Sequence, residues 1–236
     1  MSAPTRLQNG VNTSNGLGPT GDYVQPDPLF VHQQYDDFDI FTAADWTATT
    51  VGTGANALVA GDGGLLALTT SAGATDANYL QDAIASFAVS PGLPFWYKAK
   101  VKLSDANLSA LVCGVQNVNT APLTASATDG IFFTKASGQT GVTLTVRKAS
   151  ASVVGVLTGV ALANGVDAEL GFAYDPQANA GVGAFEVFFN GYKVLEMSPG
   201  SAALPTVNLV NTLGILNGAA AVKSATVDYY LIAKPR

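Results

Sequence analysis

The chain has 236 residues, of which 48% are hydrophobic and only 12% are charged. Soluble domains carry roughly 25% charged residues, so uncharged polar side chains replace charge on much of this protein's surface. Lysine and arginine total 11 against 17 aspartates and glutamates, a formal net charge of −6. This balance argues against nucleic acid as a partner, because phosphate binding needs a basic surface.

The scarcity of cysteine and histidine limits the possible chemistry. A single cysteine, Cys113, excludes an intrachain disulfide framework and a multi-cysteine zinc site, and its apolar neighbours indicate a buried thiol. The single histidine, His32, excludes a two-histidine metal motif. We therefore expect no metal, no cofactor and no histidine-dependent nucleophile. The uncharged stretches 106–128, 149–166 and 197–222 contain asparagine, glycine or proline and do not predict membrane spans.

Residues 1–31 differ from the rest of the chain. They are rich in proline, glycine and asparagine and lack the apolar period of a helix or a strand, which indicates an extended arm. Apolar side chains in its second half would be exposed if the arm were free. We expect them to contact either a neighbouring subunit or the arm's own domain. These contact residues are Tyr23, Val24, Leu29, Phe30 and Val31.

Residues 32–236 read as one domain of short strands. The segment 95–103 alternates apolar side chains with lysines, as a half-buried strand does. Asn190 and Gly191 separate two further strand patterns and predict a type I′ hairpin turn. A terminal strand is expected to place Val227, Tyr229, Leu231 and Ala233 on one face. Further strands are expected at 57–60, 65–70, 85–89, 109–117, 130–135, 151–158, 167–174 and 207–215.

Helices are expected to be single turns, near 76–84 or 105–108, because no long segment has helical spacing. Many short strands separated by glycine, asparagine and aspartate predict a β-sandwich or a barrel. No fixed-period repeat is present, which disfavours propellers and solenoids.

Two carboxylates, Asp167 and Glu169, are candidates for catalytic groups. A retaining glycosidase needs two carboxyl groups about 5–5.5 Å apart. Asp167 and Glu169 would share one face of a strand, but they follow an Asn-Gly turn and lack a third acid. We interpret them as solvated residues at a strand start and expect no catalytic residue in this chain.

Three other groups of residues leave alternatives open. The acidic cluster of Asp36, Asp37, Asp39 and Asp45 belongs either to an exposed first strand or to a calcium site, although EF-hand spacing is absent. Lysines at positions 98, 100 and 102 either meet an acidic partner or protect a strand edge.

The two tryptophans, Trp46 and Trp96, either fill a core or an interface, or offer flat faces on which a sugar stacks. Sugar stacking would make the protein a lectin-like binding module.

Several of these runs together resemble a known family. The segments 35–38, 45–47, 95–101, 129–133, 185–191 and 227–230 resemble the concanavalin-like, laminin-G-like jelly-roll sandwich, and more narrowly its versions in structural proteins of tailed-bacteriophage particles. The resemblance covers roughly residues 33–236. It implies an all-β, antiparallel jelly-roll β-sandwich at 32–236 preceded by the extended arm at 1–31. The glucanase acids and lectin calcium loop of the family have no recognisable counterpart, so those activities are not carried over.

The resemblance implies a non-enzymatic virion structural protein, and specifically a capsid decoration or cement protein that binds across capsid subunits and stabilises the head. Its partners would be the major capsid protein or other virion proteins, and further copies of itself, with a trimer favoured by capsid geometry. The protein would reside in virions assembled in the host cytoplasm, with no nucleic-acid or membrane partner. The alternative is a glycan- or receptor-binding module of a phage tail or fibre.

Overall fold

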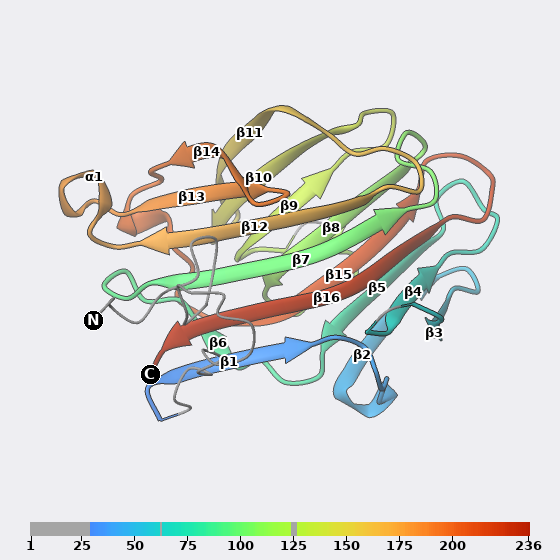
Figure 1. The fold of residues 1–236 in the computed structure, drawn as a ribbon, viewed down its shortest axis with the longest axis horizontal. Coiled ribbons are helices and arrows are strands. Elements are labelled where there is room, and N and C mark those ends of the chain that lie inside the picture. Colours follow the sequence, from blue (N-terminus) through green and yellow to red (C-terminus); the bar gives the residue numbers. More distant parts are fainter. Residues whose placement is uncertain (1–28, 62, 124–126) are drawn as a thin grey trace, which may run out of the picture.

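A computed structural model of the protein describes residues 29–61, 63–123 and 127–236. Within these residues the chain forms two antiparallel β-sheets that pack face to face, called sheet A and sheet B below. Figure 1 looks onto strands β12, β7 and β16 of sheet A, with strands of sheet B behind them. The predicted all-β, antiparallel sandwich is confirmed.

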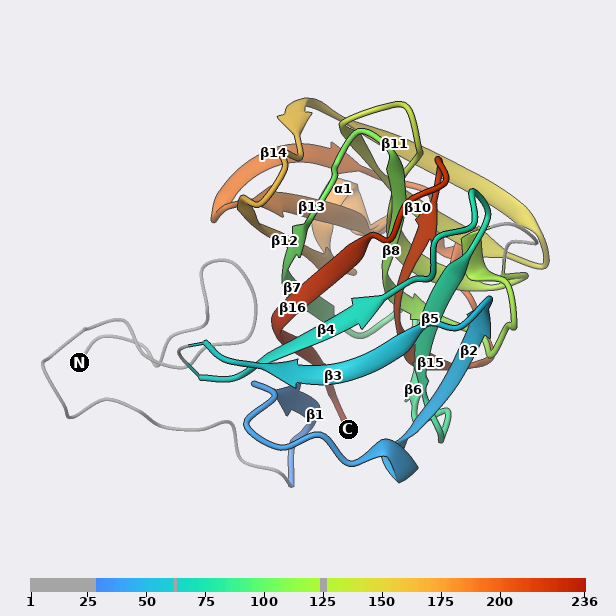
Figure 2. The same cartoon turned by 90° about the vertical axis from the view of Figure 1, so that its right-hand side faces the viewer.

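Sheet A contains eight strands among the described residues. The first strand of the chain pairs with the last, and Figure 2 shows the sheet continuing past the last strand toward β3. In sheet order the strands are β14 (Tyr192–Met197), β13 (Ala184–Phe189), β12 (Asp167–Asp175), β7 (Phe95–Leu103), β16 (Ser224–Pro235), β4 (Leu65–Thr69) and β3 (Ala55–Val59), with β1 (Val31–Asp36) beside β16.

Sheet B is also built of eight described strands. Neighbours in both sheets are often far apart in sequence, so the chain crosses repeatedly between sheets, as a jelly roll does. In sheet order the strands are β11 (Ala151–Ala161), β10 (Gly141–Lys148), β9 (Gly130–Lys135), β8 (Ser109–Gln116), β15 (Asn208–Asn217), β5 (Ala77–Asp82) and β2 (Trp46–Val51), with β6 (Phe87–Ala88) beside β15.

Helical structure in the described residues consists of short turns, among them η1 (Ala43–Asp45), α1 (Ala178–Gly181) and η3 (Ser201–Ala203). None of these is long and apolar enough to cross a membrane. Neither of the two positions expected for a helical turn is helical. Residues 77–82 form β5, and at 105–108 the Asp105 carboxylate accepts hydrogen bonds from the backbone N–H groups of Asn107 and Leu108 without a helix.

The core lies between the sheets and is rich in aromatic rings. Strand β7 alternates buried and partly exposed residues along its whole length, so one face enters the core and the other faces outward. At the centre, the Phe172 ring lies 5.5–6.2 Å from the rings of Phe95, Tyr97, Phe133 and Phe185. Offset and edge contacts of this kind add to the stabilisation that area burial gives.

Strand β5 was missed in the sequence because both of its faces are buried. On the outer face of sheet B, Ala77 and Tyr79 pack with Val112 and Phe132 in a second, smaller apolar cluster, against which Leu123 also packs. A strand covered on both sides loses the polar alternation by which strands are recognised.

A β-bulge interrupts the last strand. Val227 is opposite Val101, but Tyr229 is opposite Lys100, so Asp228 is an extra residue in β16. Val227 therefore enters the core while Tyr229 faces outward. The expectation that Val227 and Tyr229 share a face is wrong, because a bulge shifts the alternation by one residue.

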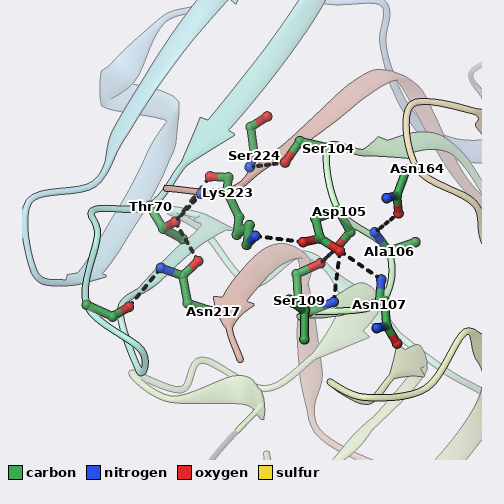
Figure 3. A network of polar contacts seen from close by, with 12 residues as sticks. Thr70, Ser104, Asp105, Ala106, Asn107, Ser109, Asn164, Asn217, Lys223 and Ser224 are labelled. Atoms are coloured by element: carbon green, nitrogen blue, oxygen red, sulfur yellow. Dashed lines mark hydrogen bonds and ion pairs between the residues drawn. The ribbon is translucent and has the colours of Figure 1, made fainter. Parts of the chain in front are cut away.

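Polar contacts close one end of the sandwich (Figure 3). The Lys223 ammonium lies 2.6 Å from the Asp105 carboxylate, and the Lys223 backbone N–H donates to the Thr70 hydroxyl. The Thr70 hydroxyl donates to the side-chain carbonyl of Asn217. Asn164 accepts a hydrogen bond from the loop that follows Asp105. These contacts join four segments that are distant in sequence, around residues 70, 105, 164 and 217–223.

Strand β1 is the first strand of the described residues. Strand β1 begins at Val31, which pairs with Pro235 at the other end of the described chain. Residues 1–28 lie outside the described residues, so the extended arm stays a prediction.

Candidate functional site

The outward-facing lysines of β7 form the centre of the candidate site. Because β7 lies between β12 and β16, these lysines do not protect a strand edge, which corrects one of the two interpretations above. Each instead contacts a carboxylate on a neighbouring strand. The N–O distances are 2.9 Å for Lys98–Glu169, 2.5 Å for Lys100–Asp228 and 3.5 Å for Lys102–Asp167.

The bulge in β16 supplies two of the side chains. By inserting one residue, it allows both Asp228 and Tyr229 to face outward next to Lys100. Tyr229, Lys100 and Glu169 lie in one cross-strand row over β16, β7 and β12. Bulges occur frequently where a strand must re-aim a side chain toward a site.

The hairpin between β13 and β14 forms one wall of the site. Asn190 and Gly191 have φ angles of 49° and 80°, as a two-residue type I′ turn requires, so the predicted hairpin is confirmed. The side-chain carbonyl of Asn190 accepts a 2.8 Å hydrogen bond from the Glu169 N–H, and the Asn190 N–H donates to the Glu169 carbonyl at 2.9 Å. These two bonds fix the turn against β12.

These elements border an open hollow of about 360 Å³ on the outer face of sheet A, called the outer pocket below. Its volume falls within the range of small-molecule sites. Its lining residues are Lys100, Asp167, Glu169, Asn190, Gly191 and Tyr229.

Hydrogen bonds connect the side chains of the outer pocket. The Tyr229 hydroxyl donates a 2.5 Å hydrogen bond to Oε2 of Glu169, and burial and this bond raise the pKa of Tyr229 well above its usual value. A hydrogen bond to Asp228 raises the pKa of Lys100. The pocket therefore offers a phenol O–H, a lysine amino group, carboxyl oxygens and a side-chain amide, which together can donate to and accept from hydroxyl groups.

The carboxylates of Asp167 and Glu169 share one strand face, as expected. Both contact a lysine ammonium group, and Glu169 also accepts from Tyr229. The opposite sheet offers no alternative pair, because Asp82 is the one carboxylate in the described strands of sheet B and it contacts Gln34 in the interior.

Asp82 is a second polar site, inside the sandwich. Its carboxylate accepts hydrogen bonds from the Gln34 side chain of sheet A and from the Asn211 backbone N–H of sheet B, at 3.1 and 3.0 Å. Gln34 also donates to the Tyr230 hydroxyl at 2.8 Å. Burial raises the pKa of Asp82 to about 6.

The two tryptophans occupy different environments. Trp46 is 8% exposed and packs against Phe38 and Tyr230 in the core, so it has no open ring face for a sugar. The suggestion of glycan stacking at Trp46 is therefore corrected. Trp96 is partly exposed on the outer face of β7, in the same row as the lysines.

The candidate arm contacts are only partly described. Tyr23 and Val24 lie outside the described residues. Leu29 and Phe30 are 76% and 71% exposed, and Val31 begins β1.

Asp36, His32 and Cys113 each make contacts within the sandwich. Asp36 accepts a hydrogen bond from the Phe38 backbone N–H. Within 29–61, 63–123 and 127–236, no three side chains of histidine, cysteine, aspartate or glutamate form a group that could hold a metal. The His32 ring stacks on Phe87 with 4.5 Å between centroids, and burial of the Cys113 thiol raises its pKa to about 12.

Comparison with solved structures identifies the fold. The endo-1,3-β-glucanase from Streptomyces sioyaensis matches over 89% of this chain and 99% of its own, with a TM-score of 0.61 at 12% identity. The Emp47p carbohydrate recognition domain matches over 88% of this chain and 98% of its own (TM-score 0.58, 11% identity). Peanut lectin matches over 86% and 97% (TM-score 0.55, 9% identity). No protein-family model and no curated protein matches the chain.

The fold is thus the concanavalin-like jelly roll that lectins and glucanases share, as the resemblance implied. At these identities the similarity concerns the fold alone, and a fold of this kind supports several functions.

Proposed function

We propose that this protein is a carbohydrate-binding protein and that the outer pocket holds the sugar. The observation that carries the proposal is the lining of the pocket, which places a tyrosine ring and hydroxyl, two carboxylates, a lysine and an asparagine around one hollow. A sugar presents hydroxyl groups around its ring and apolar C–H faces. Paired donors and acceptors beside an aromatic ring match that chemistry.

Glu169 is the central acceptor in this proposal. Lys98 and Tyr229 both contact its Oε2 atom, which leaves Oε1 without a side-chain partner among the described residues. A sugar hydroxyl that donates to Oε1 would gain a charge-assisted hydrogen bond, which is stronger than a neutral one. The fold adds support, since the carbohydrate recognition domain and the lectin above are named for sugar binding.

A glycan array followed by calorimetry tests the proposal. We expect wild-type protein to bind at least one glycan and Glu169→Gln to bind it about 10- to 100-fold more weakly, the loss of a hydrogen bond to a charged group. Glu196→Gln is the matched control, because Glu196 lies on β14 outside the pocket and should leave affinity unchanged. Equal loss in both variants, or no binding by wild type, would refute the proposal.

The same samples separate binding from hydrolysis. New reducing ends that appear with wild type and not with Glu169→Gln would replace the binding role with a glycosidase role. We expect none, because Lys98 and Tyr229 both contact Oε2 of Glu169, while glycoside hydrolysis needs two carboxyl groups free to act on the sugar.

A virion structural role is a second candidate. It rests on the jelly-roll resemblance together with the exposure of Leu29 and Phe30, two large apolar side chains where the described chain begins. Exposed apolar side chains that lie together mark interaction surfaces. In this role the chain would bind capsid subunits as a decoration or cement protein. Light scattering tests for the expected trimer. Cosedimentation of wild type and of Phe30→Ser with phage heads tests for the capsid contact. If Phe30→Ser occupies the heads as fully as wild type, Phe30 does not contribute to the contact.

A further inference from the structure

Trp96 lies on the same outer face as the outer pocket. It occupies the β7 row that continues through Lys98 to Lys100, which lines the pocket. Its cross-strand neighbours are Ala173 on β12 and Ala233 on β16. Both neighbours have only a methyl side chain, and Trp96 between them is half-buried, so part of its indole is open to a ligand. Trp96 thus offers an apolar platform next to the pocket.

The separation of the two features sets the length of the ligand. Trp96 precedes Lys100 by four positions, and at 3.2–3.4 Å per strand residue this places it about 13 Å away. One sugar unit in the outer pocket cannot reach that platform. A chain of sugars that follows β7 can, and it would pass the Lys98–Glu169 ion pair on the way.

The charge of the face sets the class of ligand. Lys98, Lys100 and Lys102 are balanced by Glu169, Asp228 and Asp167, so three positive charges meet three negative ones. An anionic ligand would approach the pocket carboxylates of a chain with a net charge of −6, and a cationic one would approach the lysines. An uncharged ligand meets neither penalty.

From these observations we infer that the ligand of the outer pocket is an uncharged, extended oligosaccharide whose chain runs along β7 and stacks on Trp96. This inference rests on the proposed function, because it assumes that the pocket holds one unit of the chain. It assigns Trp96 a separate role, recognition of chain length.

The test measures affinity against chain length by calorimetry. The probes are gluco-, galacto- and manno-oligosaccharides of one to six units, with oligogalacturonates of the same lengths as anionic probes. For wild type we expect affinity for one neutral series to rise about tenfold once the chain spans from pocket to tryptophan, an increment typical of one aromatic contact. The oligogalacturonates should bind more weakly at every length.

Variants separate this inference from the proposed function. Trp96→Ala should remove the rise with chain length and leave affinity for the shortest bound sugar unchanged, whereas Trp96→Phe keeps a ring and should retain part of the rise. If wild type binds short and long chains equally, or Trp96→Ala keeps the rise, the inference fails and the proposed function stands. If no probe binds at any length, both fail. Circular dichroism of each variant confirms that the sandwich is intact.

Discussion

The Tyr229 hydroxyl and the Lys98 ammonium contact the same oxygen of Glu169, at 2.5 and 2.9 Å. Tyr229 reaches this oxygen across β7 from the bulge in β16, and the Lys98 ammonium lies 5.9 Å from the centre of the tyrosine ring. Three strands of sheet A are therefore joined by side chains as well as by their backbones. The other oxygen of Glu169 remains available to a ligand.

Removal of the tyrosine hydroxyl tests this arrangement. Tyr229→Phe keeps the ring and loses the hydrogen bond, so we expect the free energy of unfolding to fall by about 1–2 kcal/mol, a typical value for a bond to a charged group. Sugar affinity should fall as well, because Glu169 loses its fixed orientation. Tyr192→Phe is the control, since Tyr192 is 78% exposed on the neighbouring hairpin. Denaturant unfolding and calorimetry check both, and equal stability of the two variants would contradict the importance of the bond.

The hairpin turn offers a second test of the pocket wall. Gly191 has a φ of 80°, which costs a residue with a side chain about 1–2 kcal/mol. We expect Gly191→Ala to destabilise the protein by that amount and to weaken sugar binding, because Gly191 lines the outer pocket. Gly92→Ala should be neutral, since an added methyl group meets nothing within 4 Å there. If Gly191→Ala leaves both stability and sugar affinity unchanged, the turn adopts another conformation without cost.

Those parts of the fold that follow a local pattern could be predicted from the sequence. The Asn190-Gly191 turn is specified by two residues that accept positive φ, and β7 by strict alternation. Strand β5 could not be predicted as a strand, because Asn78 and Asp82 are polar yet buried by partners from distant segments. Burial of this kind depends on tertiary structure and leaves no periodic signal.

The candidate site was predicted only in part. Strand periodicity places Asp167 and Glu169 on one face, and the alternation of 95–103 predicts the lysine row. The roles of Asp228 and Tyr229 could not be predicted, because a bulge adds one residue without any mark in the pattern of apolar residues. Strand order also decides which carboxylate meets which lysine, and sequence spacing does not contain that order.

The polar network at the end of the sandwich (Figure 3) predicts unequal effects for two lysines. The Lys223 side chain is 10% exposed and contacts Asp105, whereas the Lys193 side chain is 41% exposed and contacts Glu186 and Glu196. We expect Lys223→Met to cost about 1–3 kcal/mol and Lys193→Met less than about 1 kcal/mol, because exposed ion pairs contribute little. Thermal unfolding at neutral pH compares them.

The pH dependence of the Lys223→Met effect is a check on its cause. The hydrogen bond from Lys223 lowers the pKa of Asp105 below its usual value of 3.8. A lowered carboxyl pKa contributes stability above 3.8 that is lost as the pH falls through the folded-state pKa. The difference between Lys223→Met and wild type should therefore shrink in acid. A difference that stays constant to pH 2 would assign the effect to packing of the lysine stem.

Asp82 gives the opposite pH dependence. Its pKa rises from 3.8 to about 6 on folding, because burial between the sheets disfavours the ionised form. A raised carboxyl pKa contributes stability that is complete below 3.8 and is lost as the pH rises through about 6. The side chain of Asp82→Asn does not ionise, so the variant does not lose stability in this way as the pH rises. Relative to wild type, the variant should gain up to about 3 kcal/mol between pH 3.5 and pH 7, at about 1.4 kcal/mol per pKa unit.

Urea unfolding across this pH range measures the gain as a difference between two curves, so that other titrating groups cancel. Asp82→Asn also changes stability in a way that does not depend on pH. The amide nitrogen replaces one of the two oxygens that accept hydrogen bonds from Gln34 and Asn211. Gln34→Leu supplies the second variant: it removes a donor that stabilises the ionised form, so the titration of Asp82 should move to higher pH. A flat difference for Asp82→Asn, or a downward shift for Gln34→Leu, would mean that the carboxylate is solvated in the folded protein.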